Sequence, residues 1–326
     1  MSHNAATNIQ RAPLPEPEHH PIFSEYDSFE GPVSGDFDID FIGALTRKKY
    51  FSTTESDPTK LTIRKACFPA FDEEYFEWVD LLETVAEAGE EYVFCELGAG
   101  YGRWAGRAYL AAKRKEVSKI KLITVEGEPV HSAWLQEHLT EQGVQPSELD
   151  HFECAIGDKT GTTNFYVCPP KAESGLTPAT WYGQSRAPKS HNLSEHHTGE
   201  TYHGKPVTRS RCGYGWIEVP QVRALELLGR YQFIDLIDMD VQGEEANVVA
   251  DAITHLNDHV KRLHIGTHSQ EIEISLRKTL SVNGWDCIRD YPSGSASETP
   301  YGTIKFQDGV QTWINPRTLS KNTTRA

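Results

Sequence analysis

A glycine loop between an apolar strand and a helix constrains this chain more than any other feature. The run from Glu96 to Gly102 (ELGAGYG) follows the apolar segment 92–96 and precedes a helical segment at about 104–115. Glycine allows a sharp turn and a close approach of the backbone to a ligand, and the N-terminus of the following helix favours a negative group. The pattern therefore predicts a ligand site at the end of a strand.

Strands and helices alternate around this loop, which predicts a doubly wound, mostly parallel sheet. Besides 92–96, the expected strands are 120–126, 152–156, 233–238 and 262–267, and the expected helices are 71–86, 104–115, 131–142 and a segment that Ser269 caps. Two final strands, 285–291 and 303–314, have no helix between them. We therefore expect seven strands in all, with an antiparallel C-terminal hairpin at one edge.

The same pattern predicts the domain organisation. Residues 71–316 form the main domain, preceded by an extension at 1–70 whose first 35 residues are polar and proline-bearing, as in a flexible arm. Residues 317–326 are a tail. The insert at about 168–216 is too long for an ordinary connection, so we expect an acceptor-binding loop or lid that leaves cofactor binding to the rest of the domain, with a disordered surface excursion as the alternative.

The spacing of the loop distinguishes between two kinds of cofactor. A dinucleotide fingerprint has the spacing GxGxxG, whereas Gly98, Gly100 and Gly102 give GxGxG. Glu96 suits the ammonium of a methionine moiety and would repel a pyrophosphate. Glu126 ends the next strand, where a carboxylate accepts hydrogen bonds from both ribose hydroxyls, although it follows Gly98 by more than the usual spacing of roughly 20 residues. These residues predict S-adenosylmethionine.

Three segments carry a resemblance to a known family. The runs 96–102, 152–161 (FECAIGDKTG) and 233–245 (FIDLIDMDVQGEE) are similar to those of the FkbM family of methyltransferases. The resemblance implies a Rossmann-like class I methyltransferase fold and a cofactor site lined by five residues: Glu96, Gly98, Gly100, Glu126 and Asp158. It also implies transfer of a methyl group to an oxygen of a natural product, a sugar or another small molecule.

The sequence departs from the family pattern at two positions that bear on the chemistry. The family commonly places Lys two residues before Asp240 and Glu two residues after it, but this chain has Asp238 and Gln242 there. A lysine-based mechanism is therefore unavailable at that position. N-methylation of an amide or amine in a peptide or natural product is the alternative to O-methylation.

Three side chains are candidates for catalysis at the ends of the fourth and fifth strands. Asp238 and Asp240 are two residues apart and project to one face if the strand continues, and His268 follows the neighbouring strand. They act as a general base, or hold a divalent metal ion that lowers the pKa of the acceptor. In the third interpretation, Asp238 caps a loop, Asp240 contacts the cofactor amine and also belongs to its site, and His268 bonds to the backbone.

Charge and cysteine content limit the partners. The chain has 32 Lys and Arg against 47 Asp and Glu, a net charge of −15, which disfavours nucleic acid and anionic membranes. Six scattered cysteines without a CxxC pair are typical of a reduced cytoplasmic protein with no zinc site. We expect a small-molecule or peptide acceptor. Two other functions are weighed: a nicotinamide-dependent oxidoreductase, which the glycine spacing opposes, and a non-catalytic cofactor-binding module.

Overall fold

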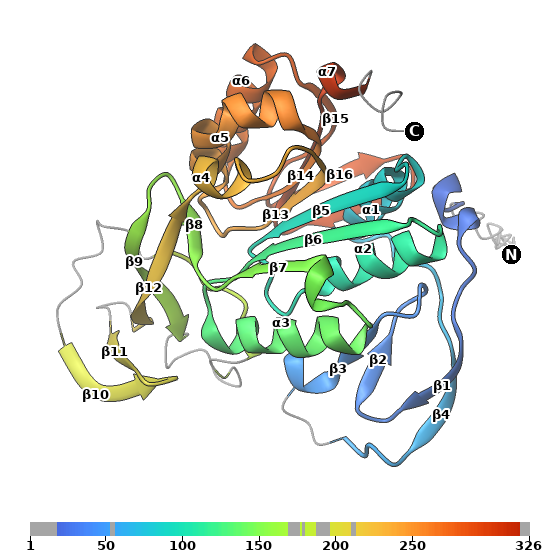
Figure 1. Ribbon diagram of the computed structural model, residues 1–326, viewed down its shortest axis with the longest axis horizontal. Coiled ribbons are helices and arrows are strands. Elements are labelled where there is room, and N and C mark those ends of the chain that lie inside the picture. Colours follow the sequence, from blue (N-terminus) through green and yellow to red (C-terminus); the bar gives the residue numbers. More distant parts are fainter. Residues whose placement is uncertain are drawn as a thin grey trace, which may run out of the picture.

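A seven-stranded sheet forms the centre of the protein in a computed structural model, which describes residues 18–52, 56–168, 177, 180–186, 196–209 and 213–319 (Figure 1). The strand order is β15-β18-β14-β13-β5-β6-β7. Five strands are parallel: β5 (Glu91–Leu97), β6 (Lys119–Val125), β7 (Leu149–Phe152), β13 (Ile234–Met239) and β14 (Val260–Thr267). At one edge β18 (Gly309–Ile314) and β15 (Asp286–Tyr291) run antiparallel. The predicted fold class is confirmed.

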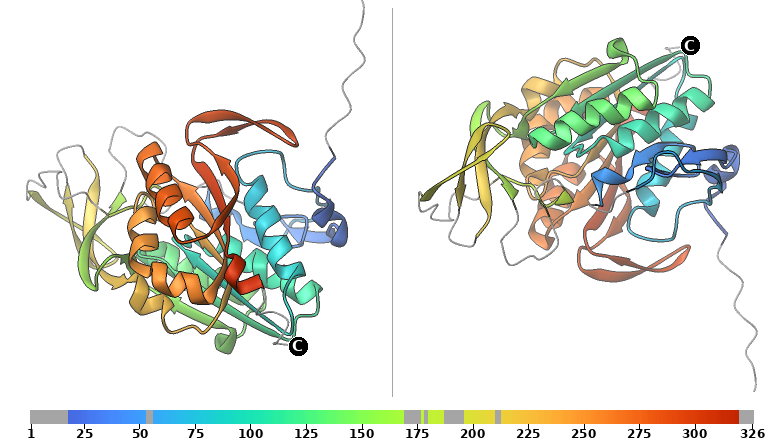
Figure 2. Two further views of the ribbon diagram at one scale, coloured as in Figure 1. Left: turned by 90° about the horizontal axis from the view of Figure 1, so that it is seen from above. Right: turned by 90° about the horizontal axis from the view of Figure 1, so that it is seen from below.

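Helices cover both faces of this sheet (Figures 1 and 2). One face carries α1 (Tyr75–Ala86), α2 (Arg103–Arg114) and α3 (Pro129–Glu141), and the other carries α4 (Ala224–Leu228), α5 (Glu245–His259) and α6 (Gln270–Val282). Alternate residues of β5 supply the two cores. Tyr92 and Phe94 belong to the core under α1 and α2, whereas Val93, Cys95 and Leu97 belong to the core under α4 to α6. A strand buried on both faces is apolar throughout.

Two expected strands are each divided in the structure. The strand predicted at 152–156 breaks where the Cys154 N–H donates to the carbonyl of Phe152, so that β7 ends and β8 (Ala155–Gly157) joins a different sheet. The strand predicted at 303–314 divides at Gln307 and Asp308 into β17 (Gly302–Phe306) and β18. The hairpin partner of β17 is β16 (Ser295–Thr299), and β18 joins the main sheet.

The insert folds as part of a second sheet beside the main one (Figure 1). Its strands are β9 (Gly161–Cys168), β10 (His196–Tyr202), β11 (Lys205–Arg209) and β12 (Gly215–Arg223), and β8 completes the sheet. Cys168 and Val207 of the insert pack there with Ile217 and Val219 in a small buried core. The described part of the insert is therefore a folded layer, and the alternative of a disordered surface excursion is wrong for it.

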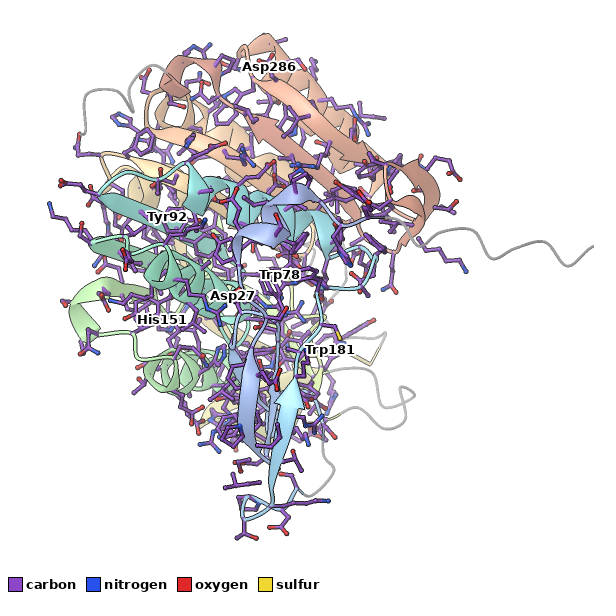
Figure 3. All side chains as sticks on the ribbon, turned by 90° about the vertical axis from the view of Figure 1, so that its right-hand side faces the viewer. Asp27, Trp78, Tyr92, His151, Trp181 and Asp286 are labelled. Carbon is purple, nitrogen blue, oxygen red and sulfur yellow. The ribbon has the colours of Figure 1, made fainter. Side chains whose placement is uncertain are left out.

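The N-terminal extension packs on the α1 side. It contains η1 (Pro21–Glu25), β1 (Glu30–Ser34), β2 (Phe37–Ile39), β3 (Leu45–Arg47), η2 (Lys48–Tyr50) and β4 (Leu61–Lys65). Phe23 and Phe41 are buried, and the ring of Phe41 lies 4.8 Å from that of Trp78 of α1, where Figure 3 shows Trp78 beside these strands. The prediction of a flexible arm is thus wrong for residues 18–35, and residues 1–17 lie outside the described range.

The C-terminal boundary also differs from the prediction. The short helix α7 (Pro316–Leu319) continues the domain into the predicted tail, and Thr318 is buried in it. Residues 320–326 lie outside the described range. Among the described residues, none of the helices combines the length and the apolar composition needed to cross a bilayer.

Candidate functional site

The glycine loop lies where β5, β6 and β13 end. The N–H groups of Gly98 and Ala99 both donate to the carbonyl of Val125, the last residue of β6. Gly98 has φ +82°, and a Cβ atom there would stand 1.8 Å from the carbonyl oxygen of Asp240. Only glycine fits such a contact. The loop is therefore held against the backbone that follows β13, and Gly102 then caps α2.

Glu126 closes the other side of the loop. It follows β6 directly, and its Oε2 accepts a hydrogen bond from the Gly100 N–H (2.7 Å) while Oε1 accepts from the Glu128 N–H (2.7 Å). The side chain is buried, and burial raises its pKa to about 8 despite these bonds. Glu126 borders a cavity of about 110 Å³ that Ala155 and Ile156 also line.

Residues of the insert cover this smaller cavity. The ring of Tyr182 stacks on that of His131 at 4.3 Å, and its hydroxyl donates to the carbonyl of Tyr50 (2.6 Å). Arg186 also lines the cavity and pairs with Glu244 (2.6 Å). The insert thus borders the cavity beside Glu126, and its role in binding the acceptor stays a prediction.

Two of the predicted cofactor residues, Gly102 and Asp158, line neither this cavity nor the larger one that adjoins it. The side chain of Asp158 is 56% exposed. It lies 3.6 Å from Arg186, which does line that cavity. Among the described residues, the contact with Arg186 is thus what connects Asp158 to this cavity.

A larger cavity of about 370 Å³ adjoins the smaller one, and both are bordered by Gly98, Gly100, Tyr182 and Asp240. Its lining is strongly acidic, with seven carboxylates: Glu73, Glu74, Glu77, Glu96, Asp238, Asp240 and Asp308. Within the described part of the chain, Arg103 is the one lysine or arginine that lines it.

Strand register explains how several of these polar groups meet. Asp238 pairs with Glu96 of β5 on one side and with His264 of β14 on the other, so the three side chains point to the same face of the sheet. Glu96 accepts hydrogen bonds from the N–H groups of Trp104 (3.3 Å) and Ala105 (2.9 Å) at the start of α2. Burial and the nearby Asp238 nevertheless raise the pKa of Glu96 well above its usual value.

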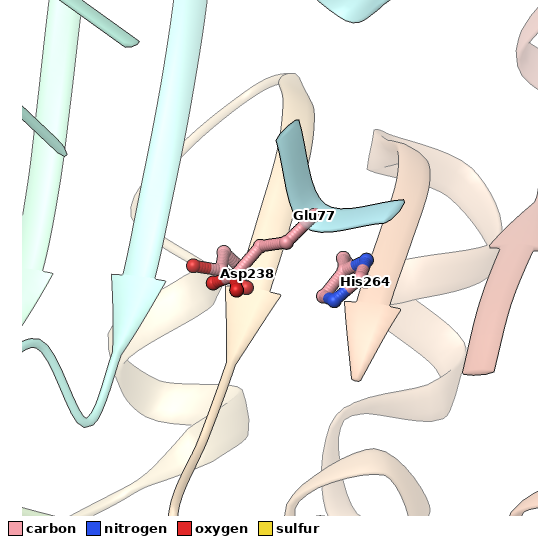
Figure 4. A group of neighbouring side chains, drawn as sticks. All are labelled: Glu77, Asp238 and His264. Carbon is pink, nitrogen blue, oxygen red and sulfur yellow. The ribbon is translucent and has the colours of Figure 1, made fainter. Parts of the chain in front are cut away.

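Glu77 of α1 lies over this row (Figure 4). One oxygen of Glu77, one oxygen of Asp238 and one ring nitrogen of His264 lie within 4.8 Å of one another. The Nδ1 atom of His264 is 2.8 Å from Asp80, a buried carboxylate. Burial disfavours the charged form of Asp80, but the cation of Arg289 and the contact with His264 keep its pKa below the usual range.

Asp240 and His268 form a second cluster, which includes a residue that sequence reasoning missed. His268 Nε2 lies 3.2 Å from Asp240 Oδ1, and Nδ1 lies 2.8 Å from the buried Glu245 at the start of α5. Burial disfavours the imidazolium, yet the contacts with the two carboxylates raise the pKa of His268 to about 10. No spacing rule links Glu245 to His268, because their contact depends on how α5 packs beside β14.

The structure therefore does not bring Asp238, Asp240 and His268 into one cluster. Asp238 belongs with Glu77, whereas Asp240 belongs with His268 and Glu245. The chain turns after β13 ends at Met239, so the two-residue spacing no longer places both carboxylates together. The three residues proposed to share one metal ion are consequently divided between two groups, each with two carboxylates and a histidine.

Comparison with known proteins identifies the family. Residues 96–280 match the model of the methyltransferase FkbM domain. The chain belongs to the FkbM methyltransferase family. A curated protein of Jannaschia sp. (strain CCS1), named "Putative methyltransferase", is 29% identical over 224 residues, which make up 67% of this chain and 70% of that protein.

Solved structures are more distant. The methyltransferase FkbM of Methylobacillus flagellatus KT has 11% identity and a TM-score of 0.41, and the match covers 69% of this chain and 44% of that one. The magnesium protoporphyrin IX methyltransferase of Synechocystis PCC 6803, solved with bound SAM, has 11% identity and a TM-score of 0.37, with 73% of this chain and 77% of that chain covered.

This FkbM protein is thus a methyltransferase, and its fold implies S-adenosylmethionine as the methyl donor. The residues present fit that molecule. A buried carboxylate stands at the end of β6, and the backbone at Gly98 leaves no room for a side chain. No nicotinamide fingerprint is present, because the third glycine comes one residue early.

Proposed function

We propose that S-adenosylmethionine binds across the two cavities and that the acceptor binds in the larger one. The main support for this proposal is the position of Glu126. The Gly100 and Glu128 N–H groups hold its carboxylate at the wall of the smaller cavity. Glu126 is suited to the ribose hydroxyls, so the adenosine belongs in the smaller cavity. Gly98, Gly100 and Gly102 shape the loop between the cavities, and Glu96 faces the methionine end.

The sulfonium group of S-adenosylmethionine supplies a methyl group that an acceptor atom attacks in line. The protein then has to align the acceptor, exclude water and take up a proton. His268 is unsuited to accept a proton at neutral pH, because it already holds one between Asp240 and Glu245. The proton acceptors of the larger cavity are therefore its carboxylates, and we assign the role to Asp238, because Asp240 is engaged with His268.

The acceptor is a small molecule or peptide of natural-product chemistry. Family resemblance favours an oxygen as the methylated atom, and nitrogen is the second candidate. A specific observation supports nitrogen: the acidic lining of the larger cavity, with seven carboxylates against one arginine among the described residues. A neutral hydroxyl needs no such excess of negative charge.

Calorimetric titration with S-adenosylhomocysteine tests the cofactor assignment directly. We expect binding of S-adenosylhomocysteine, no binding of NAD, and a rise of Tm with S-adenosylhomocysteine concentration. Glu126→Ala should weaken that binding by at least roughly 10-fold, because one good hydrogen-bonded carboxylate contributes about 1.5–3 kcal/mol. Glu218→Gln, an exposed change on β12, is the control. Equal affinity in wild type and Glu126→Ala would remove the assignment.

Methyl transfer with and without EDTA tests the role of a divalent ion. The proposed proton transfer to carboxylates predicts unchanged turnover with the chelator. Loss of turnover in EDTA and its recovery with Mg²⁺ or Mn²⁺ would instead assign one of the two carboxylate–histidine groups to a metal.

A further inference from the structure

The seven carboxylates of the larger cavity differ in whether the protein itself compensates them. Four have partners. Glu74 pairs with Arg103, Glu96 accepts from the first N–H groups of α2, Glu73 accepts from the Gln307 N–H (2.7 Å), and Asp240 pairs with His268. In the described part of the chain, the one arginine that lines the cavity is thus engaged with Glu74, and its charge also favours the ionised form of Glu77.

The remaining three are Glu77, Asp238 and Asp308. Within the described chain, no N–H or O–H donates a hydrogen bond to their carboxylates, apart from the contact that Glu77 and Asp238 make with each other. Asp238 is 6% exposed, and that small exposure faces the cavity. A carboxylate buried to this degree normally has a donor, since leaving it without one costs several kcal/mol.

The like-charged contact is the clearest sign that something is missing. Burial and Asp238 raise the pKa of Glu77 well above its usual value, and burial raises the pKa of Asp238 to about 6. Two close carboxylates share a proton unless a cation lies between them. His264 stands beside them and its charge favours the ionised form of Asp238, but its Nδ1 is engaged with Asp80 and, among the described residues, it makes no hydrogen bond to either carboxylate.

The walls of the cavity describe the rest of the ligand. Four aromatic side chains line it: Phe51, Tyr101, Trp104 and Tyr182. Aromatic faces attract cations and pack against apolar groups. A hydrated metal ion would use the carboxylates but not these rings, whereas an organic cation uses both.

We propose that the acceptor of the larger cavity is an amine that is a cation at neutral pH and carries an apolar or aromatic group, held through its N–H donors by Glu77 and Asp238 and methylated on nitrogen. This inference rests on the proposed methyl transfer and names its substrate class. The ammonium loses one proton to the Glu77–Asp238 pair, and the nitrogen lone pair forms the N–C bond as the S–C bond of the donor breaks. The sulfonium becomes a neutral thioether, and the product is an N-methylammonium.

The cofactor has an ammonium of its own, so the experiment must tell the two amines apart. S-adenosylhomocysteine carries the amino-acid group, whereas 5′-methylthioadenosine lacks it. If Glu77 and Asp238 bind the acceptor, Glu77→Gln and Asp238→Asn leave the affinity for both ligands within about 3-fold of wild type. A selective loss of affinity for S-adenosylhomocysteine would assign the pair to the cofactor ammonium and overturn the proposal.

Matched probes test the acceptor. The protein saturated with S-adenosylhomocysteine is titrated with 2-phenylethylamine, 2-phenylethanol and 3-phenylpropanoate, which differ in charge but share a ring and a chain length. We expect the amine to bind at least roughly 10-fold more tightly than the alcohol, with the carboxylate weakest, since one charge-assisted hydrogen bond contributes about 1.5–3 kcal/mol. The preference should disappear in Glu77→Gln and in Asp238→Asn but persist in Glu218→Gln.

Equal affinity for the amine and the alcohol, or no binding of the amine, would overturn the proposal. Loss of methyl transfer to a non-amine acceptor in EDTA, with recovery on addition of Mg²⁺, would overturn the proposal in favour of a metal site. These failures are separate from failure of the proposed function, which would show as the absence of S-adenosylhomocysteine binding in the wild type.

Discussion

Glu126→Gln separates what the buried carboxylate does for ligand binding from what it does to stability. The pKa of Glu126 is raised by burial from its ordinary value of 4.5 to about 8. Between pH 4.5 and about 8 the folded protein therefore holds a proton on Glu126 that the unfolded chain has released. The contribution of this proton to the free energy of unfolding is fully present below pH 4.5 and is lost as the pH rises towards 8.

The magnitude follows from the width of that window. Each pH unit between the two pKa values contributes about 1.4 kcal/mol, so wild type should lose about 2–3 kcal/mol of unfolding free energy from this group between about pH 5.5 and about pH 7.5. Gln cannot titrate. Its amide places one N–H against a backbone N–H, of Gly100 or of Glu128, which costs about 1–3 kcal/mol at every pH.

The assay is urea denaturation of wild type, Glu126→Gln and the control Glu218→Gln at both pH values, without ligand. We expect Glu126→Gln to show a shallower fall of stability with pH, whatever its absolute stability. Wild type should also bind S-adenosylhomocysteine roughly 10- to 100-fold more tightly at the higher pH, because the ribose hydroxyls favour the carboxylate. Parallel pH slopes in wild type and Glu126→Gln would refute the reasoning.

Three further changes test neighbouring parts of the site. Gly98→Ala forces a Cβ atom against the Asp240 carbonyl at φ +82°, so it should lower Tm and abolish S-adenosylhomocysteine binding. The control Gly89→Ala, where a Cβ atom would have nothing within 4 Å, should change neither property. Normal binding by Gly98→Ala would contradict the loop geometry. Glu245→Gln removes one of the two carboxylates beside His268, so the pKa of the imidazole should fall from about 10 by at least roughly 1 unit, as NMR titration would show. The affinity for S-adenosylhomocysteine should not change. An unchanged imidazole pKa would show that Asp240 alone sets its value. Tyr182→Phe keeps the stacking on His131 but loses the hydrogen bond to the Tyr50 carbonyl. It should therefore weaken S-adenosylhomocysteine binding, measured by calorimetry, less than Tyr182→Ala does. Equal effects of the two variants would mean that the stacking contributes nothing to binding.

Local patterns were sufficient for the parts of the fold that depend on neighbouring residues. The apolar run at 92–96 and the glycines after it predict a strand, a loop and a helix, and β5 and α2 are found there. The alternation of strands with helices predicts the central parallel strands correctly because each connection is a local event. Glu126 was identifiable for the same reason, since it follows directly from the end of β6.

The rest of the site depends on contacts between distant segments. Glu77 lies in α1 and meets Asp238 more than 150 residues later, and Tyr182 of the insert meets Tyr50 of the N-terminal extension. No periodicity encodes such contacts. The extension was also missed because its strands have three to five residues, too few for an alternating pattern to show.

The raised pKa values of Glu77, Glu96, Glu126 and Asp238 have a common physical origin. Each is a carboxylate that burial alone would leave protonated, and each lines one of the two adjoining cavities. A protein selected only for stability would replace such groups, because buried carboxylates without cations oppose folding. Ligands that bring hydroxyl or ammonium donors relieve this cost, so each ligand should raise the stability that the empty site lowers. The presence of buried carboxylates that lower stability is therefore an argument that these cavities bind ligands with hydrogen-bond donors. For Glu77 and Asp238 the donor that we propose is an ammonium.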